Sequence, residues 1–254
     1  MNHTETERIT TKQTVQELLS AAMPRPKVIK SGWPRIIGML ALVGLFRWLA
    51  GRQFPPRVRG FFGKLSKLGV FAAAVTAYSY RDPHREPLGN ASDFVYAPAD
   101  GTILRVEPVE DEPLFIKGPA YRILITSQPL DVPVLRAPLP GQVEYILQKT
   151  DDGTSVGVKG SENRRYLLNF RTNPYKRVSL PRPLAASEPV ELFSEAGQTF
   201  PVVEKVGVRG FGIALLTTLY VPQKDFEILI RTGQHTQAGM TVLGRIRPGG
   251  ASLL

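Results

Sequence analysis

The sequence LGVFAAAVTAYSYRDPHREP, residues 68–87, contains the boundary between two kinds of structure. Its first thirteen residues, up to Tyr80, carry no charge, and a second uncharged run of eleven residues, IIGMLALVGLF, occupies positions 36–46. Runs of this length predict two helices that form a hairpin within residues 25–80. From Arg81 onward the chain changes to short β-type runs that proline and glycine interrupt.

The second part of the chain, residues 81–254, is predicted to be β-rich. The expected strands cover residues 94–96, 101–108, 122–127, 141–147, 155–159, 166–170, 190–193, 200–208, 213–220 and 226–231. Short strands at this spacing predict a sandwich or barrel-like domain. Residues 173–189, with four prolines, are expected to form an extended excursion. The fold class is therefore α+β and mainly β, with a polar tail over residues 1–24 that contains a short helix at 14–23.

The excess positive charge of the chain belongs to the hairpin. The whole sequence holds 32 Lys and Arg against 22 Asp and Glu, but residues 25–81 hold eleven basic residues and no acidic one. Apolar runs lie between these charges, a pattern that fits anionic phospholipid headgroups better than nucleic acid. We therefore expect a membrane as the partner, and no nucleic acid.

The hairpin is expected to dip into one leaflet of a membrane. Helices of eleven to fifteen residues rise roughly 16–22 Å, less than the ~30 Å hydrocarbon layer. Aromatic residues, which favour the membrane boundary, stand at the run ends: Trp33, Trp48, Tyr78 and Tyr80. The basic residues expected to bind lipid headgroups are Arg57, Arg59, Lys64, Lys67, Arg81 and Arg85. The alternative is a soluble pair of core helices with a solvated basic face.

Several site chemistries are excluded by composition. The chain has no cysteine, which excludes disulfides, thiolate nucleophiles and sulfur-ligated metals. The three histidines, His3, His84 and His235, are far apart in sequence, so a histidine-rich metal site is not expected.

Three stretches after the hairpin carry a recognisable pattern. They are YRDPHREP at 80–87 followed by APADG at 97–101, QPLDVPVLRAP at 128–138, and SENRR at 161–165. They resemble F-R-D-P-x-R-x-x-P with S-P-A-D-G, S-P-L-D-V-H-V-N-R-A-P, and S-E-N-E-R of the phosphatidylserine decarboxylase family, in its shorter prokaryotic form. GRIRPGG at 244–250 is similar to the family's G-x-I-R-F-G-S, and GWP at 32–34 to the motif before its hydrophobic hairpin. The resemblance spans residues 30–250.

The resemblance implies a role in phospholipid metabolism. A barrel-sandwich-like β domain is indicated by the proline–glycine turn at 137–143 and the G-x-x-x-x-x-G turn at 232–240, which together resemble the modules of lipoyl and biotinyl carriers. The family removes CO₂ from the serine headgroup of phosphatidylserine and so makes phosphatidylethanolamine. Its electron sink is a pyruvoyl group, formed by self-cleavage at a Gly-Ser bond, and an Asp–His pair is implied to activate that serine. In this sequence Asp100 matches the aspartate, whereas Pro133 and Gly250 stand at the histidine and serine positions.

The two replacements predict a family member without decarboxylase activity and without a cofactor. Proline has no titratable group, and glycine has neither a hydroxyl nor a β-carbon. Such a protein is expected on the cytoplasmic face of the bacterial inner membrane, where it binds an anionic headgroup or pairs with a second copy or an active relative. Two alternatives remain: an active pyruvoyl-dependent decarboxylase that uses Ser252, and a barrel-sandwich adaptor without a lipid ligand.

Overall fold

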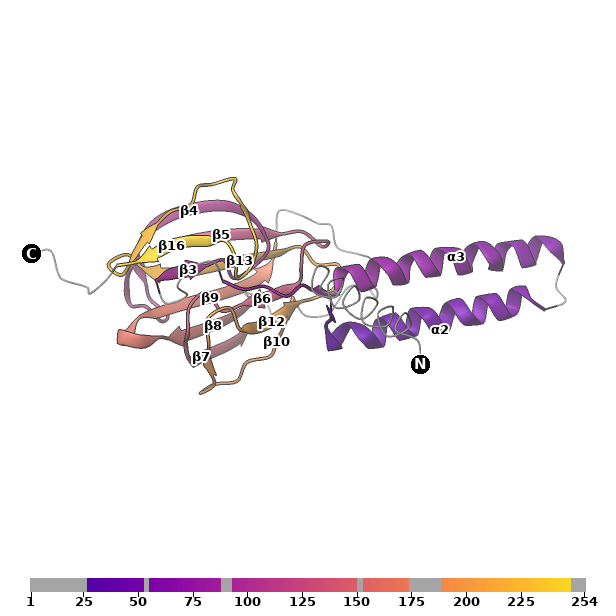
Figure 1. The fold of residues 1–254 in the computed structure, drawn as a ribbon, viewed down its shortest axis with the longest axis horizontal. Helices are drawn as coiled ribbons and strands as arrows, with labels where there is room; N and C mark the ends of the chain where they lie inside the picture. The colour runs from indigo at the N-terminus through magenta and orange to yellow at the C-terminus, as the bar shows by residue number, and fades with distance from the viewer. Residues whose placement is uncertain (1–26, 53–54, 88–92, 150–152, 174–188, 248–254) are drawn as a thin grey trace, which may run out of the picture.

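A computed structural model describes residues 27–52, 55–87, 93–149, 153–173 and 189–247 (Figure 1). It consists of a β-rich domain and a helical hairpin that projects away from it. The fold class is confirmed as α+β and mainly β. The short helix expected at 14–23, nearly all of the excursion expected at 173–189, and Gly250 and Ser252 lie outside the described residues.

The hairpin consists of helices α2 (Trp33–Ala50) and α3 (Pro56–Ser79), preceded by the 3₁₀ turn η1 (Lys30–Gly32). Proline lies in the first turn of both helices, where its missing N–H costs nothing. Helices of 18 and 24 residues are roughly 27 and 36 Å long. They exceed the expected length because they continue through charged residues beyond each apolar run. Among the described helices, α2 is long and apolar enough to cross a membrane.

The two helices pack through small side chains and expose large ones. A Cβ added to Gly69 would lie 2.6 Å from Val43 Cγ2, and Thr76 Oγ1 donates to Met39 Sδ at 3.3 Å. The large hydrophobic side chains exposed on the hairpin are Trp33, Ile37, Leu40, Leu42, Leu45, Trp48, Val58, Phe61, Leu68, Val70, Phe71 and Tyr78. Small residues between helices and large apolar ones outside are typical of helices packed in lipid.

The β domain is built around one antiparallel sheet of eight strands, in the order β11-β7-β8-β9-β13-β5-β4-β15. Their bounds are β4 Gly101–Glu112, β5 Gly118–Ser127, β7 Gly141–Lys149, β8 Gly153–Lys159, β9 Arg165–Thr172, β11 Thr199–Phe200, β13 Leu215–Pro222 and β15 His235–Thr236. Strand β13 lies inside the sheet, between β5 and β9, and is buried along most of its length. Its apolar residues therefore pack on both faces of the sheet.

Two three-stranded sheets complete the core of the domain. One contains β10 (Val190–Leu192), β12 (Lys205–Arg209) and β6 (Val134–Arg136); the other contains β14 (Phe226–Ile228), β16 (Val242–Ile246) and β3 (Phe94–Tyr96). The strand expected at 200–208 is divided between β11 and β12, because Val203 adopts a left-handed φ of 65° and its N–H donates to Ala137 O at 3.0 Å. Strands β6, β15 and β16 are among those not predicted from sequence.

The hairpin joins the β domain through Tyr80, at the end of α3. The Tyr80 ring stacks on Phe211 at a centroid distance of 5.9 Å, and the Tyr80 hydroxyl oxygen accepts a hydrogen bond from Arg35 Nη1. A Cβ on Gly32 would lie 2.6 Å from this ring. Strand β2 (Arg81–Asp82), which follows, pairs with β1 (Lys27–Val28). These contacts place the residues after Tyr80 against the end of the β domain that faces the hairpin.

Candidate functional site

Asp100 lies in a buried ion pair at the start of β4. Arg85 Nη2 donates to Asp100 Oδ2 at 2.7 Å, and Arg85 Nη1 donates to Oδ1. The same Arg85 Nη1 donates to Ala238 O at 2.9 Å, while Ala238 N donates to Asp100 Oδ1 at 2.8 Å. The side chains of Arg85 and Asp100 are 7% and 11% exposed. The structure therefore does not support the predicted headgroup contact by Arg85, because its guanidinium is turned inward.

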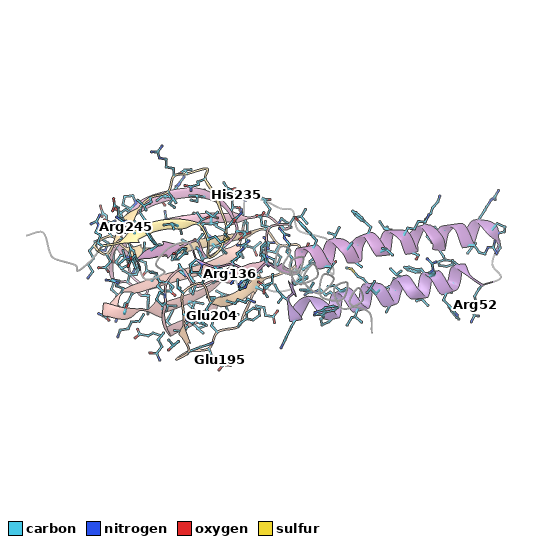
Figure 2. All side chains as sticks on the ribbon, in the orientation of Figure 1. Arg52, Arg136, Glu195, Glu204, His235 and Arg245 are labelled. Carbon is cyan, nitrogen blue, oxygen red and sulfur yellow. The ribbon has the colours of Figure 1, made fainter. Side chains whose placement is uncertain are left out.

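A second charged cluster lies beside the first. Asp82 pairs with Arg136 Nη2 at 3.1 Å and with Lys205 Nζ. Arg136, inside the β domain (Figure 2), also donates to Val203 O at 3.2 Å and to Pro83 O at 3.3 Å. Burial lowers the pKa of Arg136, and Asp82 opposes that shift. Asp82 of the YRDP stretch and Arg136 of the VLRAP stretch thus join these two segments.

Pro133 is buried immediately before β6 and has no ionisable group to offer the site. Its carbonyl oxygen accepts a hydrogen bond from Arg209 N at 2.9 Å. The Arg209 guanidinium donates to Gln128 O, to Pro129 O at 2.9 Å and to Asp131 O at 2.8 Å. Burial lowers the pKa of Arg209 to about 10. Arg209 therefore ties the loop before Pro133 to the end of β12.

The turn from β12 to β13 lies close to both Asp100 and Pro133. Gly212 in this turn has a φ of 72°, and the next residue, Ile213, is buried. Leu215, at the start of β13, pairs with Ser127, whose Oγ donates to Asp100 O. Three stretches that are far apart in sequence therefore meet at this end of the sheet, beside the base of the hairpin.

The other predicted headgroup residues form two separate groups. Arg81 lies at the hairpin base, where its guanidinium is 3.9 Å from the centre of the Tyr78 ring and donates to Leu130 O at 3.0 Å. Exposed basic residues on the opposite half of α3 are Arg57, Arg59, Lys64 and Lys67. Along the helix axis Arg59 is roughly 33 Å from Arg81. Arg52, whose guanidinium is 3.9 Å from the Trp48 ring centre, adds to the far group (Figure 2).

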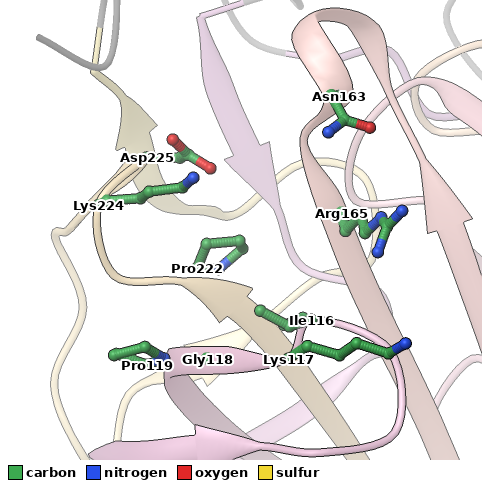
Figure 3. A pocket seen from close by; sticks show the side chains of 9 residues that line it. All are labelled: Ile116, Lys117, Gly118, Pro119, Asn163, Arg165, Pro222, Lys224 and Asp225. Atoms are coloured by element: carbon green, nitrogen blue, oxygen red, sulfur yellow. The ribbon is translucent and has the colours of Figure 1, made fainter.

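The SENRR stretch does not reach the Asp100 site. Asn163 and Arg165 line a cavity of about 440 Å³ together with Lys117 and Lys224 (Figure 3). This cavity lies at the Gly118 end of β5, and nine strand residues at about 3.3 Å each place it roughly 30 Å from the Asp100 end. The stretch therefore belongs to a different part of the domain.

Sequence reasoning missed Arg209 and the turn that follows it. A single arginine at the end of a valine-rich run gives no local sign that it will be buried and will hold another loop. No group of three His, Asp or Glu side chains that could hold a metal occurs within the described ranges. His84 lies exposed beside Glu86, and Gly250 lies outside the described residues.

Comparison with known proteins agrees with the motifs. The family model described as phosphatidylserine decarboxylase matches residues 72–244, more than half of the chain. The chain is 34% identical over 189 residues to a phosphatidylserine decarboxylase proenzyme of Salinibacter ruber, covering 72% of this chain and 81% of the relative. It is 30% identical over 241 residues to the phosphatidylserine decarboxylase proenzyme of Symbiobacterium thermophilum, a match that covers 88% of this chain and 98% of the relative. It is 31% identical over 175 residues to that of Carboxydothermus hydrogenoformans, a match that covers 67% of this chain and 79% of the relative. The chain belongs to the phosphatidylserine decarboxylase family.

Proposed function

We propose that this chain is a membrane-associated protein of phospholipid metabolism that has lost decarboxylase activity. The observation that carries this proposal is Pro133, buried at the family's histidine position in the same end of the domain as Asp100. Asp100 itself is held by Arg85 and Ala238 N. A carboxylate engaged in this way, without a neighbouring imidazole, offers no base that could activate a hydroxyl.

The residues around Asp100 also do not fit a pyruvoyl group. That group forms from a serine that follows glycine, and it consists of that serine's own atoms. The glycine-led peptide bonds in the two turns at this end of the domain are Gly210–Phe211, Gly212–Ile213 and Gly239–Met240. None of them supplies a serine, so the proposed protein works without this group.

The hairpin supports membrane association, and its base supports headgroup binding. The apolar outer surface of α2 and α3 suits hydrocarbon, and basic residues at both ends suit anionic headgroups. Arg81, at the base, directly follows Tyr80, and the Tyr80 ring stacks on Phe211 in the β12–β13 turn. A phospholipid headgroup at the hairpin base would therefore meet Arg81 beside the former catalytic site. A location on the cytoplasmic face and pairing with an active relative stay predictions.

Intact mass and lipid turnover test the loss of activity. The purified full-length chain in mild detergent is expected to run as one species of 28.1 kDa. Mixed with phosphatidylserine, it is expected to produce no phosphatidylethanolamine. Two fragments, or an ethanolamine lipid that accumulates in proportion to protein, would show that the chain is an active decarboxylase.

Vesicle flotation tests the membrane role of the distal basic residues. The variant Arg57→Gln/Arg59→Gln/Lys64→Gln/Lys67→Gln should bind anionic vesicles more weakly by about 1 kcal/mol per residue, a loss on the order of 10³-fold. The matched control neutralises four exposed cations of the β domain, Arg105, Lys117, Lys224 and Arg231. High salt should reduce the difference between variant and parent. Equal losses in variant and control would refute a specific role for the hairpin.

A further inference from the structure

The peptide bond that corresponds to the family's cleavage bond should lie against Asp100 and residue 133. The GRIRPGG stretch does not meet this condition. Arg245 and Ile246 pair with Phe94 and Phe226, and Arg247 N donates to Asp225 O at 2.9 Å. Asp225 follows the Pro222 end of β13, whereas Asp100 lies at the Leu215 end. These ends are roughly 23 Å apart along the strand, and the three residues from Arg247 to position 250 span at most roughly 11 Å.

The turn between β12 and β13 meets the condition. Arg209 N donates to Pro133 O immediately before this turn, and Val134 pairs with Val208. On the other side of the turn, Leu215 pairs with Ser127, which binds the Asp100 backbone. The turn thus connects the two strands that flank the expected Asp–His pair.

The turn also has the spacing of the cleavage motif. In G-x-I-R-F-G-S, phenylalanine follows the first glycine by four residues and is followed by glycine and serine. GVRGFGI at 207–213 has glycine, phenylalanine and glycine at those positions, and Ile213 in place of the serine. Gly212 adopts a φ of 72°, a conformation that glycine permits at little cost. The family match also ends at residue 244 and so contains this turn and excludes position 250.

We infer that Gly212–Ile213, and not Gly249–Gly250, is the counterpart of the family's cleavage bond in this chain. This inference rests on the proposed function and names the residue responsible for it. Isoleucine carries a buried sec-butyl group where a hydroxyl nucleophile would be needed. Pro133 and Ile213 then replace two neighbouring members of one catalytic set. Gly210–Phe211 and Gly239–Met240 are the competing bonds, but in neither does a phenylalanine precede the glycine, as it does in the family's F-G-S and in Phe211–Gly212.

The test is to rebuild the missing nucleophile and base. In Pro133→His/Ile213→Ser, the new hydroxyl oxygen attacks the Gly212 carbonyl carbon, and the C–N bond breaks to give an ester and a free amine. Loss of the α-proton then expels the Gly212 carboxylate and leaves an enamine. One water hydrolyses its imine tautomer to a pyruvoyl group and releases ammonia. The products are residues 1–212 and residues 213–254 with a pyruvoyl end, which mass spectrometry identifies directly.

Matched variants carry the same chemistry at the competing positions. They are Pro133→His/Phe211→Ser, Pro133→His/Met240→Ser and Pro133→His/Gly250→Ser, and each is checked for folding by circular dichroism. We expect fragments only from the variant at position 213. If that variant does not fold, Ile213→Ser alone is treated with hydroxylamine, which cleaves an ester at Gly212 but not an amide under mild conditions.

The outcomes separate this assignment from the proposed function. Cleavage at one of the competing positions in place of 213 would overturn the assignment. It would leave unaffected the proposal that the parent chain has no decarboxylase activity. An absence of both fragments and hydroxylamine-sensitive ester from the folded position-213 variants would also overturn it. Spontaneous cleavage of the parent chain would refute the proposed function itself.

Discussion

The buried pair of Arg85 and Asp100 gives a quantitative test of how the candidate site is held together. Both guanidinium Nη atoms donate to the carboxylate, and the side chains are almost fully removed from solvent. Arg85→Ala leaves the carboxylate with a single backbone donor, Ala238 N. Removal of one partner of a buried pair typically costs about 3–5 kcal/mol. We therefore expect Arg85→Ala to lower the free energy of unfolding by about 4 kcal/mol.

A double-mutant cycle isolates the pair from the rest of the site. Asp100→Ala alone should also be strongly destabilising, because it leaves the Arg85 guanidinium buried with only Ala238 O as acceptor. The double variant should lose less than the sum of the single variants, because neither charge then remains unpaired. An interaction energy of about 2–3 kcal/mol is expected for residues in direct contact.

Urea unfolding of the full chain in mild detergent, followed by circular dichroism of the sheet, provides the measurement. The free energy of unfolding should fall with urea concentration at the same slope in variant and parent, if the variants change stability and not compactness. Arg105→Ala is the matched control, since Arg105 is 66% exposed and lies 3.5 Å from Glu107. Such surface pairs contribute about 0–1 kcal/mol. If Arg85→Ala costs no more than Arg105→Ala, the argument for a structural ion pair is wrong.

Two more predictions concern the hairpin and the core. Gly69→Leu should destabilise the contact of α2 with α3 by about 1–3 kcal/mol, because the new side chain would collide with Val43. The control Gly60→Leu should cost less, because no atom lies near the Cβ position of Gly60. Equal losses of stability in thermal unfolding would contradict this packing. Burial raises the pKa of Tyr166, whose hydroxyl donates to Leu139 O at 2.8 Å, so this residue contributes stability that is present at neutral pH and lost above the ordinary tyrosine pKa of about 10. Tyr166→Phe should therefore cost about 1 kcal/mol near neutral pH and flatten the alkaline fall in unfolding free energy; an unchanged fall would contradict this assignment.

Much of the fold follows from local pattern. Strand β3, in a three-stranded sheet, has the predicted bounds of 94–96, and the strands predicted in the large sheet lie within a few residues of those observed. The strands missed are short or lie in segments whose local signals conflict. Strand β6 lies between Pro133 and Pro138, and its extended conformation is stabilised by pairing with β12 and by the hydrogen bond from Arg136 N to Pro98 O at 2.9 Å. Helix lengths were underestimated because apolar runs were counted without the charged residues into which the helices continue.

The site was less predictable than the fold. Asp100 and Pro133 could be named from the motifs, but Arg85 was expected at a lipid surface and lies in the interior. The sequence shows that an arginine is present and not which carboxylate it will meet. Arg209 and the turn after it were missed for the same reason, because their partners at 128–133 are far away in the chain.

The sequence by itself determined the class of this protein: a basic apolar hairpin, a β-rich domain, the family, and a proline where the family's motif has a histidine. These properties depend on residue type, periodicity and the order of short motifs, all of which are local. Only the tertiary structure decided that Arg85 neutralises Asp100 and that the β12–β13 turn lies beside Pro133. Those relations depend on strand pairing between distant segments, because the burial of charge and the approach of one loop to another exist only after the sheet has formed.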